Sequence, residues 1–458
     1  MTRLERVTRD TFHSLRSRNY RLYFFGQVVS VSGTWMQGLA QSWLVLQLTG
    51  SGALLGLTTG LQFLPMLVFG PFAGVLADRV DKRRLLIATQ STAGVLAVGL
   101  GLLTASGAIQ LWMVMVFAFL FGCVVAVDNP ARQSFLLEMV GPEDLPNAVT
   151  LNSVVINAAR AVGPAIGGLL IAGVGIAACF LLNGMSYLAV IGALVLMRNA
   201  DLHLAKRAGR GPKQLREGLA YVWANPELRI PLLVMAAIGT LTYNFHITLP
   251  LLAKFTFGGG PLAYGILSGV MGVGAVVGGL ASARRVNASV ASLLTSAWVF
   301  GGLMLLVAVA PTLPLAVAAL LLVGAASIRF MATANAALQL GARPEMRGRV
   351  MALWGVAFLG STPIGSPIVG WIGETQGARV ALVVGAAAAI AASLFGKAAL
   401  RRSTIPAGHE TLEPAEGVAV GLSRRWRRVA PTGRAPAYAA RPGHQRRVHN
   451  GISIARQG

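Results

Sequence analysis

The segment GVLADRVDKRRLL, residues 74–86, carries the densest cluster of charge in the chain. Six of the seven residues from Asp78 to Arg84 are charged, whereas charged residues make up only 12% of the 458 residues. Two runs without any charge flank this cluster, residues 53–77 before it and residues 85–109 after it. Each run is long enough to cross a hydrocarbon core of roughly 30 Å as a helix. The segment therefore predicts a short charged loop between two membrane-spanning helices.

The composition of the whole chain indicates a membrane protein. Hydrophobic residues make up 55% of the sequence, and the mean hydropathy is +0.65. A soluble domain carries about 25% charged residues, roughly twice the proportion found here. Charge-free runs that could cross a bilayer begin near Tyr23, Ala53, Leu85, Leu111, Ala148, Ile176, Ile230, Leu262, Val290, Leu313, Val350 and Val380. We therefore predict an all-α membrane protein with twelve transmembrane helices.

Basic residues collect in alternate loops. The chain carries six Lys and Arg residues up to Arg21, four in the loop after the second run, and seven between Arg198 and Arg229. On the other side only Lys254 and Arg379 are basic. Because Lys and Arg accumulate on the cytoplasmic side of a membrane, we predict that both termini are cytoplasmic. The net charge of +23 then lies mostly in cytoplasmic loops and in the C-terminal tail, and it requires no nucleic-acid partner. The tail could touch anionic membrane lipid or be a solvated segment.

The two halves of the sequence resemble each other weakly. Pro142-Glu143 matches Pro344-Glu345, and Pro164 and Gly167 match Pro367 and Gly370 at nearly the same offset. A duplicated six-helix unit explains such matches, and parallel repeats are related by an axis along the membrane normal. The predicted domains are a cytoplasmic tail (1–19), a six-helix bundle (20–197), a linker with an amphipathic helix (198–229), a second six-helix bundle (230–397) and a basic disordered tail (398–458).

The charged loop resembles the loop between the second and third helices of the major facilitator superfamily. The residues that carry the resemblance are Gly74, Leu76, Ala77, Asp78, Arg79, Arg83 and Arg84, and Asp81 stands where the family usually has glycine. The resemblance implies a fold of two six-helix bundles related by pseudo-twofold symmetry. It also implies that Asp78 and its arginines form a cytoplasmic conformational latch between the two halves. The alternative is that these charges only fix the topology.

The segment AARAVGPAIGGLL, residues 158–170, resembles a motif of family members that export by antiport. Gly163, Pro164, Gly167 and Gly168 match the motif, and Ala159 stands where the motif has an upstream glycine. The resemblance implies proton antiport. Close packing of helices through small residues is the alternative explanation.

Two further segments are similar to the branch that includes the enterobactin exporter and the macrolide efflux pumps, namely residues 17–51 and residues 129–153. This resemblance implies a monomeric secondary transporter that exports a drug, macrolide or siderophore-like compound across the bacterial cytoplasmic membrane by alternating access. An uptake carrier or a lipid flippase on the same fold is one alternative. A membrane receptor or assembly factor is another.

Ionisable residues inside the predicted spans are candidates for functional sites, because charge is expensive within a bilayer. Arg160 lies near mid-depth and could hold an anionic substrate group in a cavity, or it could be a buried structural hydrogen-bond donor. His246 is a second cavity candidate. It could be a histidine whose hydrogen bonds are made within the protein, or it could be a proton carrier. Asp128 and Arg329 are candidates for a charge or proton role, although Asp128 could cap a helix boundary and Arg329 could snorkel. Residues Asn129 and Pro130 predict the start of a loop helix.

The first span combines many polar residues with no charge. Gln27, Ser30, Thr34, Gln37 and Gln41 recur at intervals of three to four residues and so share one helical face. We predict that this polar stripe lines the substrate cavity, with bonding between helices as the alternative. The sequence contains no nucleotide-binding loop, no nucleophile–base set and no cluster of metal ligands, so we expect no cofactor and no enzymatic activity.

Overall fold

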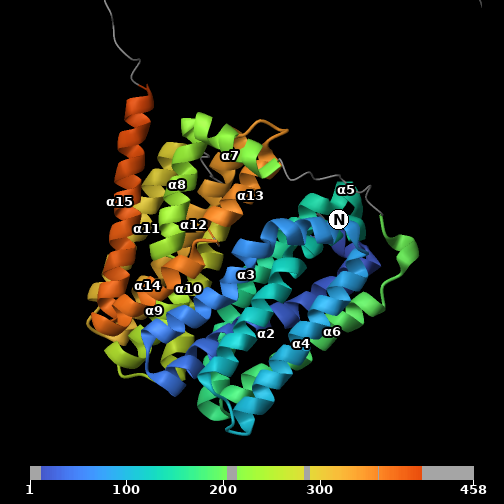
Figure 1. The fold of residues 1–458 in the computed structure, drawn as a ribbon, viewed down its shortest axis with the longest axis horizontal. Coiled ribbons are helices and arrows are strands. Elements are labelled where there is room, and N and C mark those ends of the chain that lie inside the picture. Colours follow the sequence, from blue (N-terminus) through green and yellow to red (C-terminus); the bar gives the residue numbers. More distant parts are fainter. Residues whose placement is uncertain (1–11, 204–213, 283–288, 359, 405–458) are drawn as a thin grey trace, which may run out of the picture. The chain divides into compact units, whose positions relative to one another are not determined.

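The structure is a computed structural model that describes residues 12–203, 214–282, 289–358 and 360–404. These residues form helices and the short connections between them (Figure 1). The predicted tails lie outside the described residues up to residue 11 and from residue 405 onward. Part of the predicted N-terminal tail is ordered, because the short helix η1 (His13–Arg16) docks on a later helix through a bond from Ser14 Oγ to the Asp144 carbonyl oxygen, 3.0 Å long.

The helices fall into an N-terminal and a C-terminal group. The N-terminal group consists of α2 (Arg18–Thr49), α3 (Gly52–Arg79), α4 (Lys82–Ala105), α5 (Leu111–Gly173) and α6 (Ile176–Val195), followed by the short η2 (Asn199–Asp201). The C-terminal group consists of α8 (Pro226–Leu241), α9 (Phe245–Leu251), η3 (Leu252–Thr256), α10 (Pro261–Ser282), α11 (Val290–Val309), α12 (Leu313–Gly341), α13 (Arg347–Phe358), α14 (Thr362–Thr375) and α15 (Ala378–Thr404). Helix α7 (Gln214–Ala224) connects the groups.

Polar side chains set several helix ends. Ser51 precedes α3 and its Oγ accepts a hydrogen bond from the Leu54 N–H, and Gly50 ends α2 with a positive φ of 65°. Asp81 precedes α4 and accepts a hydrogen bond of 2.8 Å from the Arg84 N–H. A side-chain acceptor at this position satisfies a backbone donor that the first helical turn leaves free. The departure from the family glycine at Asp81 therefore supplies a helix cap.

Ten segments of the described chain are long and apolar enough to cross a membrane. Helix α2 is not among them, because its five stripe residues and other polar side chains lower its hydropathy. Helix α5 counts once, although its 63 residues contain two of the predicted spans. The chain is thus a multi-pass membrane protein of almost entirely helical structure.

Helix α5 corrects the boundary expected at Asn129 and Pro130. The helix continues through Pro130, and its non-helical residue is Gly141, with φ of 76° and ψ of 173°. Glycine adopts this backbone conformation without the steric cost that a Cβ would add. The chain therefore turns eleven residues later than the proline predicts.

Helices α8 and α9 show that the span beginning near Ile230 is broken. Thr242, Tyr243 and Asn244 separate the two helices. The side chain of Asn244 compensates in part, since its Nδ2 donates to the Thr240 carbonyl oxygen over 2.7 Å. Irregular backbone at membrane depth is tolerated where it lies inside the protein or lines a cavity.

Two helix pairs make the most extensive contacts between the groups. Helix α3 packs along α14, and α5 packs along α10. Glycines allow the backbones to approach closely: a Cβ on Gly370 would lie 2.2 Å from the Gly52 carbonyl oxygen, and a Cβ on Gly168 would lie 2.8 Å from the Gly265 Cα. Small residues at such contacts are typical of membrane helices.

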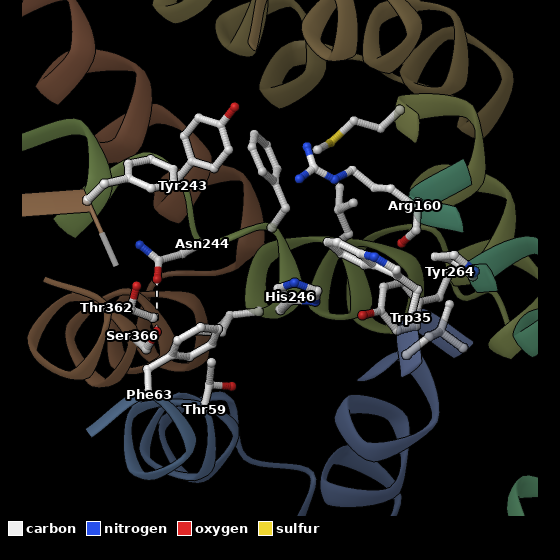
Figure 2. A pocket seen from close by; sticks show the side chains of 18 residues that line it. Trp35, Thr59, Phe63, Arg160, Tyr243, Asn244, His246, Tyr264, Thr362 and Ser366 are labelled. Atoms are coloured by element: carbon white, nitrogen blue, oxygen red, sulfur yellow. Dashed lines mark hydrogen bonds between the residues drawn. The ribbon is translucent and has the colours of Figure 1, made fainter. Parts of the chain in front are cut away.

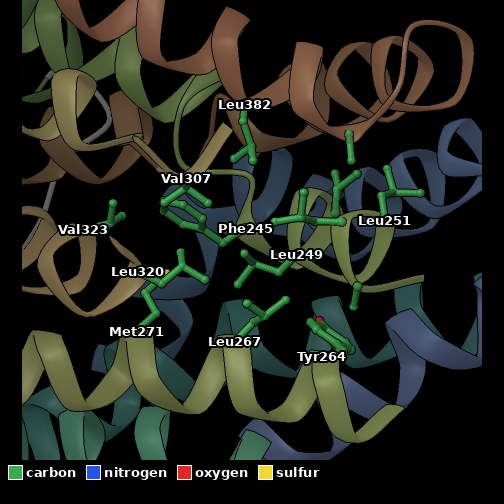
Figure 3. Close-up of a cluster of buried hydrophobic side chains, with 14 of the residues drawn as sticks. Phe245, Leu249, Leu251, Tyr264, Leu267, Met271, Val307, Leu320, Val323 and Leu382 are labelled. Atoms are coloured by element: carbon green, nitrogen blue, oxygen red, sulfur yellow. The ribbon is translucent and has the colours of Figure 1, made fainter. Parts of the chain in front are cut away.

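A continuous apolar core extends from the N-terminal group through the C-terminal group. Figure 3 shows side chains from five elements that meet in it: Phe245, Leu249, Leu251, Tyr264, Leu267, Met271, Val307, Leu320, Val323 and Leu382. Large apolar side chains also point outward, including Val95 at 72% exposed and Val174 at 74%. An exposed surface of this kind suits lipid rather than water.

Helix α7 lies where the sequence predicts an amphipathic helix. Val222 is buried against a cluster that includes Leu228 and Val350, and Glu217 pairs with Arg349 at 2.8 Å. Leu219 and Trp223 are about half exposed. One part of the apolar face of α7 therefore packs on α8 and α13, and the other part is exposed on the surface.

Candidate functional site

A cavity lies where the N-terminal and C-terminal groups meet. It holds about 1030 Å³ of space, part of it open to solvent. Seven helices contribute to its walls, together with the break between α8 and α9. The lining residues are Trp35, Leu39, Thr59, Phe63, Arg160, Pro164, Tyr243, Asn244, Phe245, His246, Ile247, Leu249, Tyr264, Ser268, Met271, Phe358, Thr362 and Ser366.

Arg160 brings a positive charge into this mostly apolar cavity. Its guanidinium carbon lies 5.0 Å from the centre of the Trp35 ring, a cation–π contact. Its Nε is buried and finds no hydrogen-bond partner within the described part of the chain. A buried donor without a partner is costly, so this nitrogen is available to a ligand.

His246 reaches the same aromatic ring from the C-terminal group. Its imidazole stacks on Trp35 with ring centres 5.8 Å apart and planes inclined by 22°. Figure 2 shows the guanidinium of Arg160 and the imidazole of His246 to either side of the Trp35 ring. The structure therefore brings together two of the seven residues proposed from sequence for the cavity, Arg160 and His246, with an aromatic ring between them.

The opposite wall of the cavity is polar but uncharged. Asn244 Oδ1 accepts a hydrogen bond of 3.0 Å from Ser366 Oγ, and Thr362 lies one helical turn before Ser366 on α14 (Figure 2). The break before α9 places Asn244 at this wall. The cavity thus offers a cation at one side, aromatic surface in the middle and hydrogen-bonding groups at the other side.

The polar stripe of the first span faces other helices. Gln27 Oε1 accepts from Arg132 at 2.6 Å, Gln37 Oε1 accepts from Asn183 at 2.6 Å, and Thr34 Oγ1 lies 3.3 Å from Tyr187 Oη. Ser30 is buried as well. None of these four residues is among those that line the large cavity. The reason is that every one of these three bonds joins α2 to α5 or α6.

Gln41 differs from the rest of the stripe. Its Nε2 donates to Gln62 Oε1 over 2.9 Å, and both residues line a smaller cavity that also includes Phe63 and His246. Phe63 and His246 line the large cavity too. Gln41 therefore lies beside the candidate site rather than in it.

Asp128 is the centre of a buried polar network. Its carboxylate accepts from Thr89 at 2.7 Å and from Gln90 at 2.8 Å, and it pairs with Arg132 one turn further along α5. Only 4% of Asp128 is exposed. The network supplies hydrogen-bond donors to the buried Asp128 carboxylate within the N-terminal group. Asp128 does not cap a helix end here, because α5 continues through it.

The glycines of the GPAIGG segment contact two different helices. A Cβ on Gly163 would lie 2.6 Å from the Ser32 carbonyl oxygen of α2, and one on Gly167 would meet Met36 and Leu39. Gly168 touches Gly265 of α10, while Pro164 lines the cavity. One short segment thus sets the spacing both within the N-terminal group and between the groups.

The charged loop contacts its own group. Arg83 donates to the carbonyl oxygens of Leu194 and Val195 near the end of α6, at 2.7 and 2.9 Å, and also to Asn199. Arg79 and Arg84 are exposed. Gly74 and Asp78 belong to the last turns of α3, and their surroundings lie outside the described part of the structure. The described bonds of Arg83 therefore tie α4 to α6.

Arg329 is exposed on α12 and does not line either cavity. Among the described residues, no group of three or more His, Cys, Asp or Glu could hold a metal ion. Sequence reasoning missed Trp35, Tyr243 and Asn244 as cavity residues. The run LTYNFHITLP, residues 241–250, contained the signal for the last two, since a polar Tyr-Asn pair in an apolar span is unusual.

Comparison with solved structures shows the fold. A bacterial homologue of the human lysosomal transporter Spinster, in an inward-facing and unoccupied conformation, superposes with a TM-score of 0.69 at 16% identity, covering 84% of this chain and 97% of that one. The nucleoside transporter NupG gives a TM-score of 0.66 at 13% identity, covering 84% and 99%.

Three curated relatives align at similar identity. The staphyloferrin A transporter of Staphylococcus aureus is 26% identical over 258 residues, which is 56% of this chain and 65% of that protein. Macrolide efflux protein A of Streptococcus pyogenes is 26% identical over 76% of this chain and 88% of its own length. The multidrug efflux pump Tap of Mycolicibacterium fortuitum is 27% identical over 78% and 89%. The chain therefore spans slightly less than two thirds of the first relative and most of the other two.

The family model described as transmembrane secretion effector matches residues 9–419, a region that includes every residue of the cavity. Members of this family are transporters rather than enzymes. On the fold, the cavity and this match, the chain belongs to the transmembrane secretion effector family of the major facilitator superfamily.

Proposed function

We propose that this protein is a secondary transporter that exports small organic compounds from the bacterial cytoplasm. The observation that carries the proposal is the cavity between the two helix groups, which combines aromatic walls with Arg160, whose buried Nε has no hydrogen-bond partner among the described residues. A bulky, partly hydrophobic compound with an anionic or polar group suits such a cavity. The efflux functions named for two of the relatives favour export over uptake.

The proposed topology has twelve membrane crossings and both termini in the cytoplasm. It treats α2 as a crossing despite its polar stripe, because those polar groups are bonded to neighbouring helices. It also treats α5 as two crossings that meet at Gly141. The distribution of basic residues between alternate loops supports the orientation in the cytoplasmic membrane. We propose a monomer, since both helix groups of one chain contribute walls to the cavity.

Alternating access is the proposed mechanism, in which the two six-helix bundles rock about the cavity. The sequence repeat supports it, because Pro164 and Gly167 on α5 correspond to Pro367 and Gly370 on α14. These two helices make equivalent contacts: α5 with α10, and α14 with α3. A pseudo-twofold axis would exchange the two contacts.

The charged loop is proposed to act as a latch in the state where the cytoplasmic side is closed. Asp78→Asn removes a charge at nearly constant volume, so it should reduce transport while the protein still reaches the membrane. Normal transport by this variant in vesicles would show that the loop only fixes the topology. A second variant, Arg83→Gln, tests separately the bonds between α4 and α6.

Proton antiport is the proposed energy source. We propose Asp128, which is buried within the N-terminal group, and His246, which lines the cavity, as the groups that exchange a proton. Export of a screened substrate from an efflux-deficient bacterium should stop when the proton gradient is collapsed while ATP is maintained. Export that continues under this condition would exclude proton coupling, and net accumulation of the substrate in cells would favour an uptake carrier.

A further inference from the structure

On the face opposite the arginine-rich loops, Glu374 reaches from α14 to the start of α3. Its Oε2 accepts hydrogen bonds from Ser51 Oγ at 2.5 Å and from the Ala53 N–H at 2.8 Å. Ser51 Oγ in turn accepts from the Leu54 N–H. The hydroxyl therefore links the Glu374 carboxylate to a second backbone N–H at the start of α3. A carboxylate is stabilised at this position because the N-terminus of a helix carries partial positive charge.

Lys254 makes the complementary contact on the same face. Its Nζ donates to the Leu46 carbonyl oxygen at 2.7 Å, and this carbonyl belongs to the last turn of α2, where it also accepts from the Gly50 N–H. An ammonium group is stabilised at the C-terminus of a helix, which carries partial negative charge. The C-terminal group therefore holds the connection between α2 and α3 from both sides, with one charge of each sign.

Beside these two charged contacts, the start of α3 packs closely against α14 and α9. A Cβ on Gly52 would lie 2.7 Å from the Gly370 carbonyl oxygen and 3.1 Å from a methyl carbon of Leu251, and Gly373 meets Leu251 as well. The cavity lies further along the same two helices, at Thr59 and Ser366. From Gly52 to Thr59 is about 10 Å at the helical rise, so the contact lies between the cavity and this face.

We infer that Glu374 and Lys254 form an outer gate that keeps the cavity closed on the face opposite the arginine-rich loops. The inference rests on the orientation given under the proposed function. Glu374 is exposed and Lys254 is partly exposed, so water can replace their bonds when the groups rock apart. The gate is therefore held by contacts that are weak enough to open in each transport cycle.

Arg379 provides a matched control. It is the second basic residue predicted on this face, and its Nη2 donates to the Ala310 carbonyl oxygen at 2.7 Å. This bond also joins a cation to the end of a helix, but both partners belong to the C-terminal group. Removing Arg379 should leave the gate intact.

The test measures access to the cavity from each side of the membrane. A single reporter, Ser268→Cys, is introduced into a chain with Cys123→Ser and Cys179→Ala, and its reaction with a membrane-impermeant maleimide is timed in intact cells and in inverted vesicles. Glu374→Gln and Lys254→Gln should each raise the labelling rate in cells by about two- to fivefold, and the double variant should raise it further. Lys254→Arg and Arg379→Gln should label at the parent rate.

Equal labelling of all variants, or an equal rise with Arg379→Gln, would overturn the gate. Size-exclusion profiles in detergent identify any variant that has lost its fold, and Lys254→Arg keeps the comparison valid if Lys254→Gln is lost. Labelling needs no transport, so the gate can be assessed if the protein exports none of the compounds screened. A rise that occurs only in inverted vesicles would keep the gate but reverse the proposed orientation.

Discussion

At the scale of single residues, Arg160 has the clearest chemical consequence. Its guanidinium stacks on Trp35, yet its Nε has no partner within the described structure. A cation held in this way keeps its donors in a fixed fork that matches a carboxylate or phosphate. The residue therefore favours substrates with an anionic group.

Arg160→Ala should weaken transport of anionic compounds roughly ten- to hundredfold, because hydrogen bonds to a charged group contribute about 1.5–3 kcal/mol. Arg160→Lys keeps the charge and loses the fork, so the loss should be smaller. The measurement is uptake into inverted vesicles of matched anionic and neutral compounds, with the exposed Arg329→Ala as a control. Equal losses for both compounds, together with lower thermal stability, would make Arg160 a structural residue.

Asp128 and Arg132 carry a second prediction at this scale. Removing one partner of a buried ion pair leaves an uncompensated charge and costs about 3–5 kcal/mol. Asp128→Asn should lower the melting temperature in detergent more than the double variant Asp128→Asn/Arg132→Gln does. If the single variant were as stable as the parent but unable to transport against a gradient, the role of Asp128 in proton exchange would be favoured over a structural one.

At the scale of secondary-structure elements, glycines determine how closely the helix groups approach. Gly168 on α5 faces Gly265 on α10, so any side chain there must push the two backbones apart. Gly173, five residues later on the same helix, has no described atom within 4 Å of an added Cβ. The two positions therefore separate the effect of contact from the effect of helix propensity.

Gly168→Val should reduce transport and lower thermal stability, because a Cβ at this position would already lie 2.8 Å from the Gly265 Cα. The cost of such overpacking is typically about 1–3 kcal/mol. Gly173→Val should have little effect on either property. Transport rates and melting temperatures of both variants check the prediction, which fails if the two substitutions behave alike.

At the scale of the whole molecule, membrane topology follows from charge. A reporter that is active only in the cytoplasm should be active when fused after Arg402 and inactive when fused after Gly107. Gly107 lies in the connection between α4 and α5, which carries no basic residue. Activity at Gly107 with none at Arg402 would reverse the proposed orientation.

The sequence by itself determined the membrane class, most of the helices and the superfamily. The hydropathy and charge of a segment decide whether that segment prefers lipid or water. This preference depends on local residues, so it can be read from a short stretch such as residues 74–86 without knowledge of distant contacts. Arg160 and His246 were predicted for the same reason, because a charge or an imidazole in an apolar span is conspicuous wherever it points.

The tertiary structure decided which polar groups meet. Gln27 and Arg132 are 105 residues apart, and Ser51 and Glu374 are 323 apart, yet each pair is bonded. Whether a stripe such as that of α2 faces a cavity or another helix depends on how the helix is rotated within its group. That rotation is fixed by packing against several other helices at once, and no local pattern in the sequence specifies it.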